Sequence, residues 1–432
     1  MSKFSGIDAT LISALNGKSF FSLSPTESEN GVIYFEKGGF NNSVIDANSI
    51  FSESSVSLYK SQISDRTDIV SLKANAYHLY ALSSSGVLYS MGGSNTSNMG
   101  RTVSGEGNEP YKLLESLTSV SKFAPHENGC WAVKTDGTLW WCGSITRYAT
   151  SSDTGQGTVS SSNGWLQYGS DTDWLDVYSW TPYPTTSFAI KGSGGTEYLY
   201  SCGYNTYGKT GLGTTAGSTY GWTRVKSDSV TNWTETIDSV SCGYYSTSII
   251  SKNGKLYLMG EGQYHGCGQG TTTDQLYPIQ ENTNATNWVK TYDAGQAGVF
   301  AINSSNELYA STWATFYYEV RPSIVDRTFR QCGTDTDYED MRFINNNNST
   351  GAEIIFKKST DGNWYYNANE TTYMFGGSLG QSSGADDWKT INEALQGNDM
   401  TNTADITDIL ISFKLNNQTL GEVITMSISG ST

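Results

Sequence analysis

The clearest pattern along the chain is a pair of bulky residues that recurs at intervals of 51 to 60 residues. The first members of the pairs are Ile33, Leu88, Leu139, Leu199, Leu256, Leu308 and Trp364, and an aromatic residue follows each of them. Short runs of strand-forming residues surround the pairs, with glycine, asparagine and serine between them. A period of this length indicates one supersecondary unit copied in tandem, because such a unit cannot bury its apolar face alone.

Dipeptides of the Asn-Gly type precede most of these pairs and predict β-hairpins. Asn253-Gly254 separates two apolar runs, and the related dipeptides are Asn30-Gly31, Ser85-Gly86, Asp136-Gly137 and Asp361-Gly362. A type I′ turn needs positive φ at both central residues, which these residue types tolerate. Each unit is therefore predicted to be a small antiparallel meander.

A bulky residue 19 to 26 positions before the pair is expected to open the first strand of a unit, because blades bury their faces against each other. These residues are Ile69, Leu117, Trp174, Trp233, Trp288 and Tyr338. The segment Asp386–Ile391 looks like one more such start without a hairpin, whereas the first hairpin has no obvious strand before it. We expect the strand around Trp388 to complete the blade begun at the N-terminus, which removes exposed sheet edges.

The repeat resembles that of the RCC1-repeat β-propellers, whose Leu-Tyr strand leads into Gly-x-Asn-x-x-Gly-Gln-x-Gly. The best copy runs from Leu199 through Gly203, Asn205 and Gly208 to Gly211, and Leu256–Gly268 is similar. The resemblance implies an all-β, seven-bladed propeller over residues 18–398. Outside it, we predict an N-terminal anchoring segment (1–17) and a C-terminal β-hairpin extension (399–432). The resemblance also implies a binding surface, but no single activity, because the family includes an exchange factor, ubiquitin-ligase modules and protein inhibitors.

Charge and hydropathy narrow the classes of function. Lys plus Arg number 26 against 42 Asp plus Glu, which gives a formal net charge of −16, and no basic stripe is present to attract a polyanion. The start of the chain, Met1–Gly6, lacks the apolar core of a signal peptide, and no 18 apolar residues run together. We expect a soluble protein that is not exported by the usual route, binds no nucleic acid and enters no membrane.

Cysteine and histidine are too scattered to predict a metal or catalytic site. No Cys-x-x-Cys pair occurs, so buried thiols are expected, with disulfides left open. The cysteines are Cys130, Cys142, Cys202, Cys242, Cys267 and Cys332. The histidines, His78, His126 and His265, fall in different units, which favours surface or strand-packing roles. No enzymatic activity and no cofactor are predicted.

Two further motifs have structural interpretations. The segment Gly203–Thr210 matches the P-loop pattern, but Gly211–Thr219 is a poor helix former, and a phosphate-binding loop must run directly into a helix. The acidic residues of Asp335–Asp340 are candidate Ca²⁺ ligands. Because Asp171-Thr-Asp173 occupies the same place in another unit, a turn before a first strand is the favoured interpretation.

Aromatic residues in the loops are the candidate partner-binding residues, because tyrosine supplies rigid, amphipathic contact area at low entropy cost. They are Tyr204, Tyr207, Tyr244, Tyr245, Tyr264, Trp313, Tyr317 and Tyr318. The alternative is that half of them pack on adjacent loops.

The two ends of the chain bear on the biological setting. Phe4–Ala9 echoes Leu15–Phe20, and this arrangement resembles the short tandem elements near the N-termini of some tailed-phage virion proteins. Near the other end, Asp408–Leu415 and Leu420–Ile428 are predicted to form a hairpin turned at Asn416-Asn417, which needs a sheet to join.

Two functions follow from these features. The first hypothesis is a non-catalytic virion component of a bacteriophage tail, fibre or surface appendage, assembled in the host cytoplasm. It would bind other virion proteins through its terminal segments, and a host surface protein or glycan through its loops. The alternative is a free protein-binding propeller that acts as an intracellular regulator or inhibitor.

Overall fold

The computed structural model describes the chain most fully between residues 114 and 345. The described residues are 22–23, 33–36, 58–60, 68–74, 78–92, 99–101, 114–126, 128–144, 161–179, 186–215, 217–263, 267–293, 298–311, 328–332, 334–345, 352–358, 360, 364–367, 389–390, 405–406, 413–415, 418–420 and 428–429. The N-terminal tandem element, Phe4–Phe20, lies outside them.

Consecutive strands build six four-stranded antiparallel sheets in this part of the chain. The first two are β4 (Ile69–Ala74), β5 (His78–Ser83), β6 (Leu88–Gly92) and β7 (Leu114–Leu117), then β8 (Val120–His126), β9 (Gly129–Lys134), β10 (Leu139–Ser144) and β11 (Ser161–Tyr168). The next two are β12 (Trp174–Ser179), β13 (Thr186–Ser193), β14 (Thr196–Tyr204) and β15 (Ser218–Arg224), then β16 (Ile237–Cys242), β17 (Ser246–Ser251), β18 (Leu256–Gly260) and β19 (Gln275–Gln280). The last two are β20 (Trp288–Asp293), β21 (Val299–Asn303), β22 (Leu308–Ser311) and β23 (Arg330–Gln331), then β24 (Tyr338–Asn345), β25 (Ala352–Lys358), β26 (Trp364–Asn367) and β27 (Lys389–Thr390).

A three-stranded sheet precedes them, formed by β1 (Ser22–Leu23), β2 (Ile33–Glu36) and β3 (Leu58–Lys60). All seven bulky pairs of the repeat lie in strands: six in the third strand of a four-stranded sheet and Ile33-Tyr34 in the middle strand β2. The predicted all-β fold and tandem repetition are confirmed, and the seven sheets are consistent with seven repeat units.

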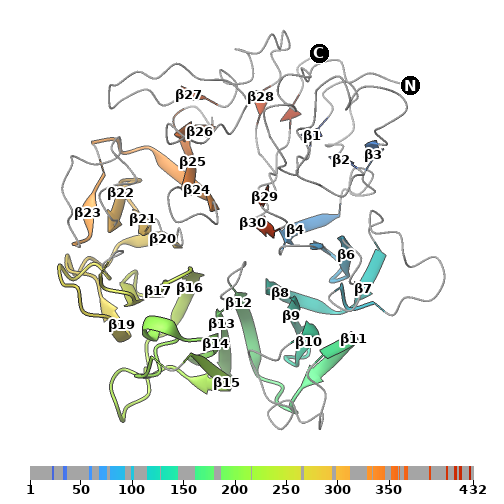
Figure 1. The fold of residues 1–432 in the computed structure, drawn as a ribbon, viewed down its shortest axis with the longest axis horizontal. Coiled ribbons are helices and arrows are strands. Elements are labelled where there is room, and N and C mark those ends of the chain that lie inside the picture. The colour runs from blue at the N-terminus through green and yellow to red at the C-terminus, as the bar shows by residue number, and fades with distance from the viewer. Residues whose placement is uncertain are drawn as a thin grey trace.

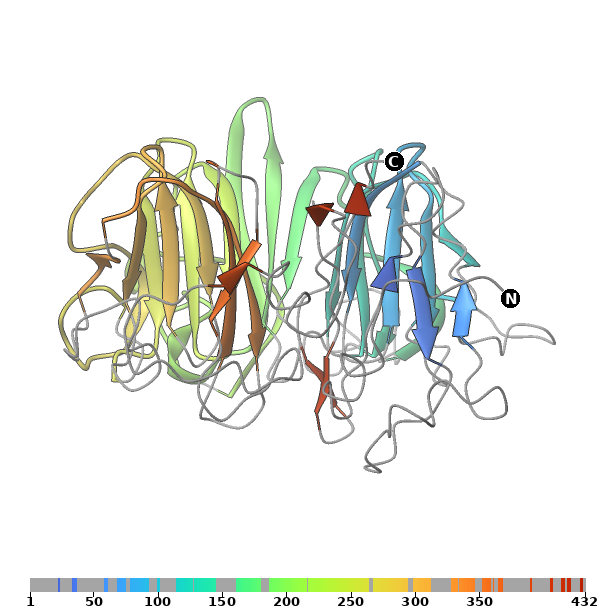
Figure 2. The same ribbon diagram turned by 90° about the horizontal axis from the view of Figure 1, so that it is seen from above.

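The sheets stand radially around a common centre (Figure 1). The first strand of each four-stranded sheet is innermost, and the order of the sheets around the ring follows the sequence. Seen from the side, the strands run roughly along the axis of the ring (Figure 2). Each first strand therefore has one edge paired with the second strand of its own sheet, and its other edge faces the centre.

The predicted closure of the ring through Asp386–Ile391 is wrong. Within that segment, β27 pairs with β26, and Thr390 lies opposite Tyr365. These residues supply the outer, fourth strand of the last four-stranded sheet instead of a strand in the N-terminal sheet. The repeat itself gives the reason, because every other third strand is also followed by a fourth strand of the same sheet.

Two of the predicted strand openings are displaced. Leu117 ends β7, and Trp233 lies four residues before β16, so Val120 and Ile237 open the first strands in those two sheets. Trp174, Trp288 and Tyr338 do open theirs, and Ile69 opens β4. The position requires only a buried side chain, and Val120 and Ile237 are as buried there as the tryptophans are elsewhere.

Every inner strand is bulged at its second residue. The register against the neighbouring second strand shifts at the same place in all six sheets. The bulged residues are Val70, Ser121, Leu175, Asp238, Val289 and Glu339. A bulge leaves its extra residue outside the ladder of backbone hydrogen bonds and turns its side chain in a new direction.

The hairpins between second and third strands are confirmed, but the turns at Ser85-Gly86, Asp136-Gly137 and Asn253-Gly254 are not type I′, because only the glycine has positive φ. The β13–β14 turn at Gly194-Gly195, with φ 62° and 85°, does have positive φ at both central residues. Asn30-Gly31 and Asp361-Gly362 lie outside the described residues. In the turn Ser251–Lys255 the amide of Gly254 donates to the carbonyl of Ser251 at 2.8 Å, and Gly254 has φ 71°. Asn253 has no positive φ, so the turn is a type I turn closed by one left-handed residue. Asn306 takes the place of the glycine in the next sheet, with φ 58°. We call the end of the ring that carries these turns the hairpin end.

Hydrophobic clusters hold neighbouring sheets together. One cluster joins Trp131 and Trp141 of β8–β11 to Trp174 of the next sheet, with Trp222 packed edge-on against Trp131 at 5.1 Å. A second joins Phe188 and other residues of β12–β15 to the sheet β16–β19. Burial of each such side chain stabilises the fold by about 2 kcal/mol, so each sheet depends on its neighbours for much of its core.

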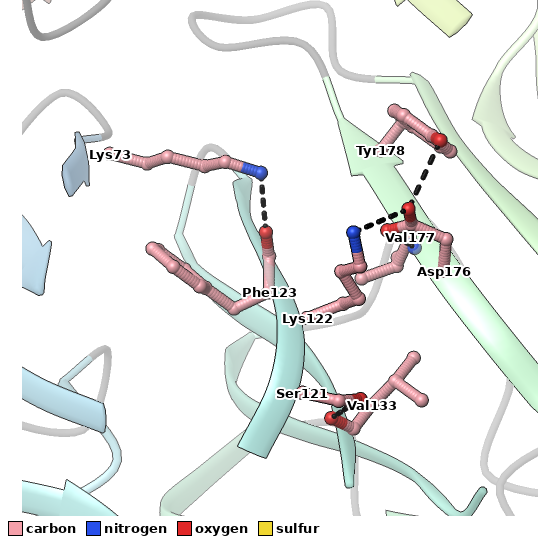
Figure 3. A network of polar contacts seen from close by, with 8 residues as sticks. All are labelled: Lys73, Ser121, Lys122, Phe123, Val133, Asp176, Val177 and Tyr178. Carbon is pink, nitrogen blue, oxygen red and sulfur yellow. Dashed lines mark hydrogen bonds and ion pairs between the residues drawn. The ribbon is translucent and has the colours of Figure 1, made fainter. Parts of the chain in front are cut away.

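Lysine side chains tie the inner strands of adjacent sheets to each other (Figure 3). The Nζ of Lys73 on β4 donates to the carbonyl of Phe123 on β8 at 2.8 Å, and Lys122 on β8 lies 3.3 Å from Asp176 on β12. On the other side of the ring, Lys290 lies 3.8 Å from Asp340 of the next inner strand. These partly exposed ion pairs contribute little stability but fix neighbouring strands in register.

The C-terminal hairpin is confirmed in a shorter form. The strands β29 (Phe413–Leu415) and β30 (Gln418–Leu420) pair with Leu415 opposite Gln418, which places the turn at Asn416-Asn417 as predicted. Ile428, the last residue of the predicted second arm, lies instead in β31 (Ile428–Ser429), which pairs with β28 (Asp405–Ile406).

Candidate protein-contact site

Four of the predicted contact residues come together where two sheets adjoin. Tyr204 ends β14, Tyr207 lies in the 3-10 turn η3 (Thr206–Gly208), and Tyr244 and Tyr245 form the connection between β16 and β17. We call these four residues the tyrosine cluster. Tyr264, Trp313, Tyr317 and Tyr318 lie outside the described residues.

Three rings of the cluster, those of Tyr207, Tyr244 and Tyr245, contact each other edge to face. Tyr207 and Tyr245 have ring centroids 5.2 Å apart at 88°, and Tyr244 and Tyr245 are 4.3 Å apart at 87°. All four tyrosines are partly exposed. Edge-to-face aromatic pairs each add about 1 kcal/mol beyond their burial, so the cluster is ordered before any partner arrives.

The backbone under Tyr207 is held in a strained conformation. Tyr207 has φ 64°, which side-chain-bearing residues adopt rarely. Asn205 beneath it is fully buried, and its Oδ1 accepts the amide of Thr210 at 3.1 Å and the Thr210 hydroxyl at 2.6 Å. The Nδ2 of Asn205 donates to the carbonyl of Thr214 at 2.9 Å, so one side chain closes the loop at both ends.

Lys209 connects the two loops from below. Its side chain is 0% exposed, and its Nζ donates to the carbonyls of Tyr244 at 2.8 Å and Gly243 at 3.3 Å. The amine also lies 5.7 Å from the ring centre of Tyr204. Burial lowers the pKa of Lys209 to about 7, although the nearby Cys242 and Asp293 oppose this shift.

This geometry explains the P-loop match. The residues that follow Lys209 are bends up to residue 213 and are not helical through 215, and the amine faces carbonyl oxygens of the neighbouring loop. Lys209 occupies the position at which the RCC1-type repeat has glutamine. This replacement is the one signal in the sequence that could have indicated its structural role.

A third sheet contributes Asp293, the last residue of β20. Its Oδ2 accepts the hydroxyl of Ser246 at 2.6 Å, and its amide donates to the Oγ of Ser241 at 2.8 Å. A Cβ at Gly243 would lie 1.7 Å from the Asp293 carboxylate, so only glycine fits beside it. The loops that carry the tyrosine cluster therefore rest on polar contacts from three consecutive sheets.

Glu261 lies beside the cluster and has an unusual charge state. It is buried at the end of β18, and burial first, then the charge of Asp274, raises its pKa to about 7. Burial, followed by Tyr244 and Glu261, raises the pKa of Tyr245 well above its ordinary value. Nothing in the sequence pattern singles out Glu261 or Asp293, because their burial depends on loops from other sheets.

The remaining candidates have packing roles where they are described. His78 and His126 are buried in strands, and burial lowers the pKa of His126 to about 3. The six cysteines are free and buried, as predicted. His265 lies outside the described residues.

The two acidic segments do occupy equivalent places, each directly before an inner strand, as predicted. Asp171 and Asp173 form ion pairs with Lys191, at 2.6 and 3.6 Å. In the second segment the hydroxyl of Thr360 donates to Asp337, and the hydroxyl of Tyr292 donates to Asp340. The described residues contain no group of three His, Cys, Asp or Glu side chains placed to hold a metal ion.

Among the described residues, no helix has the length and apolar character that crossing a membrane requires.

Radial four-stranded antiparallel sheets in sequence order around a common centre define a β-propeller. The family model of the Regulator of chromosome condensation (RCC1) repeat matches residues 253–302, so this part of the ring is similar to an RCC1 repeat. The protein is thus an RCC1-like β-propeller, as its repeat sequence indicated.

Relatives and solved structures agree with this assignment. The chain is 25% identical over 267 residues to the ultraviolet-B receptor UVR8 of Arabidopsis thaliana, covering 58% of this chain and 55% of that protein. It is 25% identical over 256 residues to the Regulator of chromosome condensation of Drosophila melanogaster, covering 55% and 44%. The chain therefore matches about half the length of these curated relatives.

The structure of Prp20p from Saccharomyces cerevisiae superposes with a TM-score of 0.57 at 11% identity, covering 84% of this chain and 83% of that chain. Yeast RCC1 (Prp20) bound to Kap60 gives a TM-score of 0.55 at 12% identity, covering 84% and 81%. At these identities the likeness concerns the fold alone.

Proposed function

We propose that this chain is a non-catalytic, protein-binding propeller, and that the tyrosine cluster is part of its contact surface. The observation that carries the proposal is the convergence of four partly exposed tyrosines from two adjoining sheets. The rings of Tyr207, Tyr244 and Tyr245 contact at 4.3 and 5.2 Å between their centres, and the Lys209 amine links Tyr204 to Tyr244. Aromatic side chains that are ordered before binding lose little entropy when a partner covers them.

The support beneath the cluster favours binding over chemistry. The side chains of Asn205 and Lys209 form hydrogen bonds with backbone groups of the loops, and Asp293 accepts a hydrogen bond from a serine hydroxyl. Such contacts fix the loops in one arrangement, which is what a preformed interface requires. One structurally similar protein, yeast Prp20p, binds Gsp1p and histones, and this supports protein recognition on a ring of this kind.

For the biological setting, we propose a bacteriophage virion, in a tail, fibre or surface appendage. This rests on the resemblance of Phe4–Phe20 to tandem elements of tailed-phage virion proteins. The alternative is a free intracellular regulator, which the curated relatives favour because both are eukaryotic and one is named as a regulator. Mass spectrometry of purified particles separates the two settings: the chain is expected among the particle proteins, and its absence there would favour the regulator.

Site-specific photo-cross-linking in the producing cell tests the contact surface itself. A benzophenone amino acid replaces Tyr207 in one sample and Val230 in another; Val230 is 87% exposed in the connection between β15 and β16, outside the cluster. We expect a discrete protein adduct from position 207 and none from position 230. Equal adducts from both positions, or none from 207, would contradict a contact role for the cluster.

A further inference from the structure

The six bulged residues of the inner strands form a second surface, which we call the inner ring. Its members are Val70, Ser121, Leu175, Asp238, Val289 and Glu339. Val70 is 64% exposed, Leu175 42% and Val289 46%, and these are half of the six large hydrophobic residues exposed in the described part of the chain. They occupy one register, in alternate sheets, so their exposure repeats with the fold.

The packing of an inner strand leaves its bulged residue outside the buried contacts on either side of it. On β12, Trp174 and Val177 are buried in the cluster between two sheets, while Asp176 contacts Lys122 of β8. The inner edge of β12 has no neighbouring strand in its sheet. Leu175 is thus left exposed between two packed positions, and the same holds for Val289 on β20, between the buried Trp288 and the paired Lys290.

The charges of the inner ring are acidic. Asp238 is exposed and has no ion-pair partner among the described residues, and Glu339 stands at the same register two sheets further on. The lysines next along these strands are already engaged, Lys122 with Asp176 and Lys290 with Asp340. Aliphatic side chains therefore alternate with polar or acidic ones around the ring.

The inner ring lies at the opposite end of the propeller from the tyrosine cluster. On β16, Asp238 is the second residue, whereas Tyr244 follows the last residue, Cys242. The repeat places the other bulged residues at the same end of their strands. A partner on this surface would not compete with one on the tyrosine cluster.

We propose that the inner ring docks a protein segment that presents aliphatic side chains next to lysine or arginine. Aliphatic side chains of the partner would remove Val70, Leu175 and Val289 from water. Burial of exposed apolar surface of this kind is energetically favourable. Basic side chains would pair with the exposed Asp238, and the net charge of −16 attracts a cationic segment from a distance. This surface and its partner chemistry go beyond the function proposed above.

Synthetic peptides of one length provide the test on the full chain. Four fluorescent peptides carry leucine with lysine, leucine with glutamate, leucine with serine, and serine with lysine, and each has a benzophenone at its centre. Fluorescence anisotropy is expected to show that the leucine–lysine peptide binds at least about tenfold more tightly than the other three, which corresponds to about 1.4 kcal/mol. Its affinity is expected to fall as salt rises, because exposed charges are screened.

Variants place the binding on the inner ring. The triple substitution Val70→Ser, Leu175→Ser and Val289→Ser is expected to weaken the leucine–lysine peptide about tenfold or more, and Asp238→Asn to reduce its salt dependence. Val230→Ser is the matched control, because Val230 is 87% exposed in the connection after β15 and lies outside the ring. Thermal melting of each variant verifies that the fold is retained.

Cross-linked peptide is expected on β4, β12 or β20. Equal affinity for the four peptides, unchanged binding by the triple variant, or cross-links confined to the tyrosine cluster would each overturn the proposal.

Discussion

The two ends of the propeller differ in what determines their geometry. At the hairpin end, the turns Lys134–Thr138, Ser251–Lys255 and Asn303–Glu307 share the same backbone hydrogen bonds and one left-handed residue each. At the other end, which we call the loop end, the connections before β15 and β17 are built from individual contacts of Asn205, Lys209 and Asp293. The comparison indicates that the repeat specifies one end, while particular buried side chains specify the end that carries the tyrosine cluster.

The largest expected effect is at a hairpin-end glycine. Gly137 has φ 79°, and a Cβ there would lie 2.1 Å from the carbonyl oxygen of Thr172 in the connection to the next inner strand. Gly137→Ala is expected to lower the free energy of unfolding by about 3 kcal/mol, because strain and a backbone clash act together. Urea denaturation measures the change.

Gly217→Ala at the loop end is the matched control. A Cβ at Gly217 meets nothing within 4 Å, so this variant is expected to stay within about 0.5 kcal/mol of the parent. Equal effects of the two substitutions would show that the repeated turns do not determine the geometry of the hairpin end.

The next effect is the pH dependence that Lys209 gives the loop end. Because burial lowers its pKa from 10.5 to about 7, the unfolded chain binds more protons than the folded chain between these values. Stability from this group therefore rises as pH increases above about 7 and is lost as pH falls through it. Urea denaturation at pH 7 and pH 8.5 is expected to show a smaller rise in stability for Lys209→Met than for the parent.

Comparison with Lys209→Met is necessary because the buried cysteines, with their raised pKa values, act in the opposite direction above pH 8. Identical pH profiles for parent and variant would show that the amine is not buried as described.

Glu261, also at the loop end, gives the free energy of unfolding a pH dependence of the opposite sign. Its pKa rises from 4.5 to about 7 through burial and Asp274, so the folded chain binds the extra proton between these values. Stability from this group is present below pH 4.5 and is lost as pH rises through 7. In the parent, this group is expected to lower the free energy of unfolding by about 1 to 2 kcal/mol between pH 5 and pH 7.5. Glu261→Gln is expected to abolish that decrease, which thermal melting across the same pH range measures. A steeper profile in the variant would contradict the burial of this carboxyl group.

The smallest expected effect is at an exposed ion pair between sheets at the hairpin end. Lys252 lies 2.7 Å from Glu197 of the preceding sheet, with half of the lysine side chain exposed. Glu197→Gln is expected to change the free energy of unfolding by less than about 0.5 kcal/mol, because water and salt screen such pairs. A loss above 1 kcal/mol in chemical denaturation would show that surface charges help to hold the sheets together.

The sequence was sufficient to predict features that repeat. The bulky pairs located the third strands, and the glycine dipeptides located the hairpins, because both patterns are local. The turn type was wrong because Asn253 and Asp136 are compatible with several turns, and the sheet geometry selects among them. The ring closure at Trp388 was wrong because a single strand start does not reveal which sheet it joins.

The candidate site was predicted in its residue types but not in its construction. Loop tyrosines are visible in the sequence, and Tyr204, Tyr207, Tyr244 and Tyr245 do gather at one place. The buried groups beneath them come from three consecutive sheets, and their proximity depends on how neighbouring sheets pack, which local patterns do not encode.

The central claim is that the tyrosine cluster of the loop end contacts a protein partner. The most direct test takes the partner protein that cross-links to position 207 and measures its dissociation constant for two variants of this chain. One is the double variant Tyr207→Ala and Tyr245→Ala, and the control is Val230→Ala, at an exposed position in the connection after β15. We predict a loss of affinity of about tenfold or more for the double variant and less than about twofold for the control, because aromatic residues at the centre of an interface carry most of its energy. Equal affinities for the two variants would contradict the account.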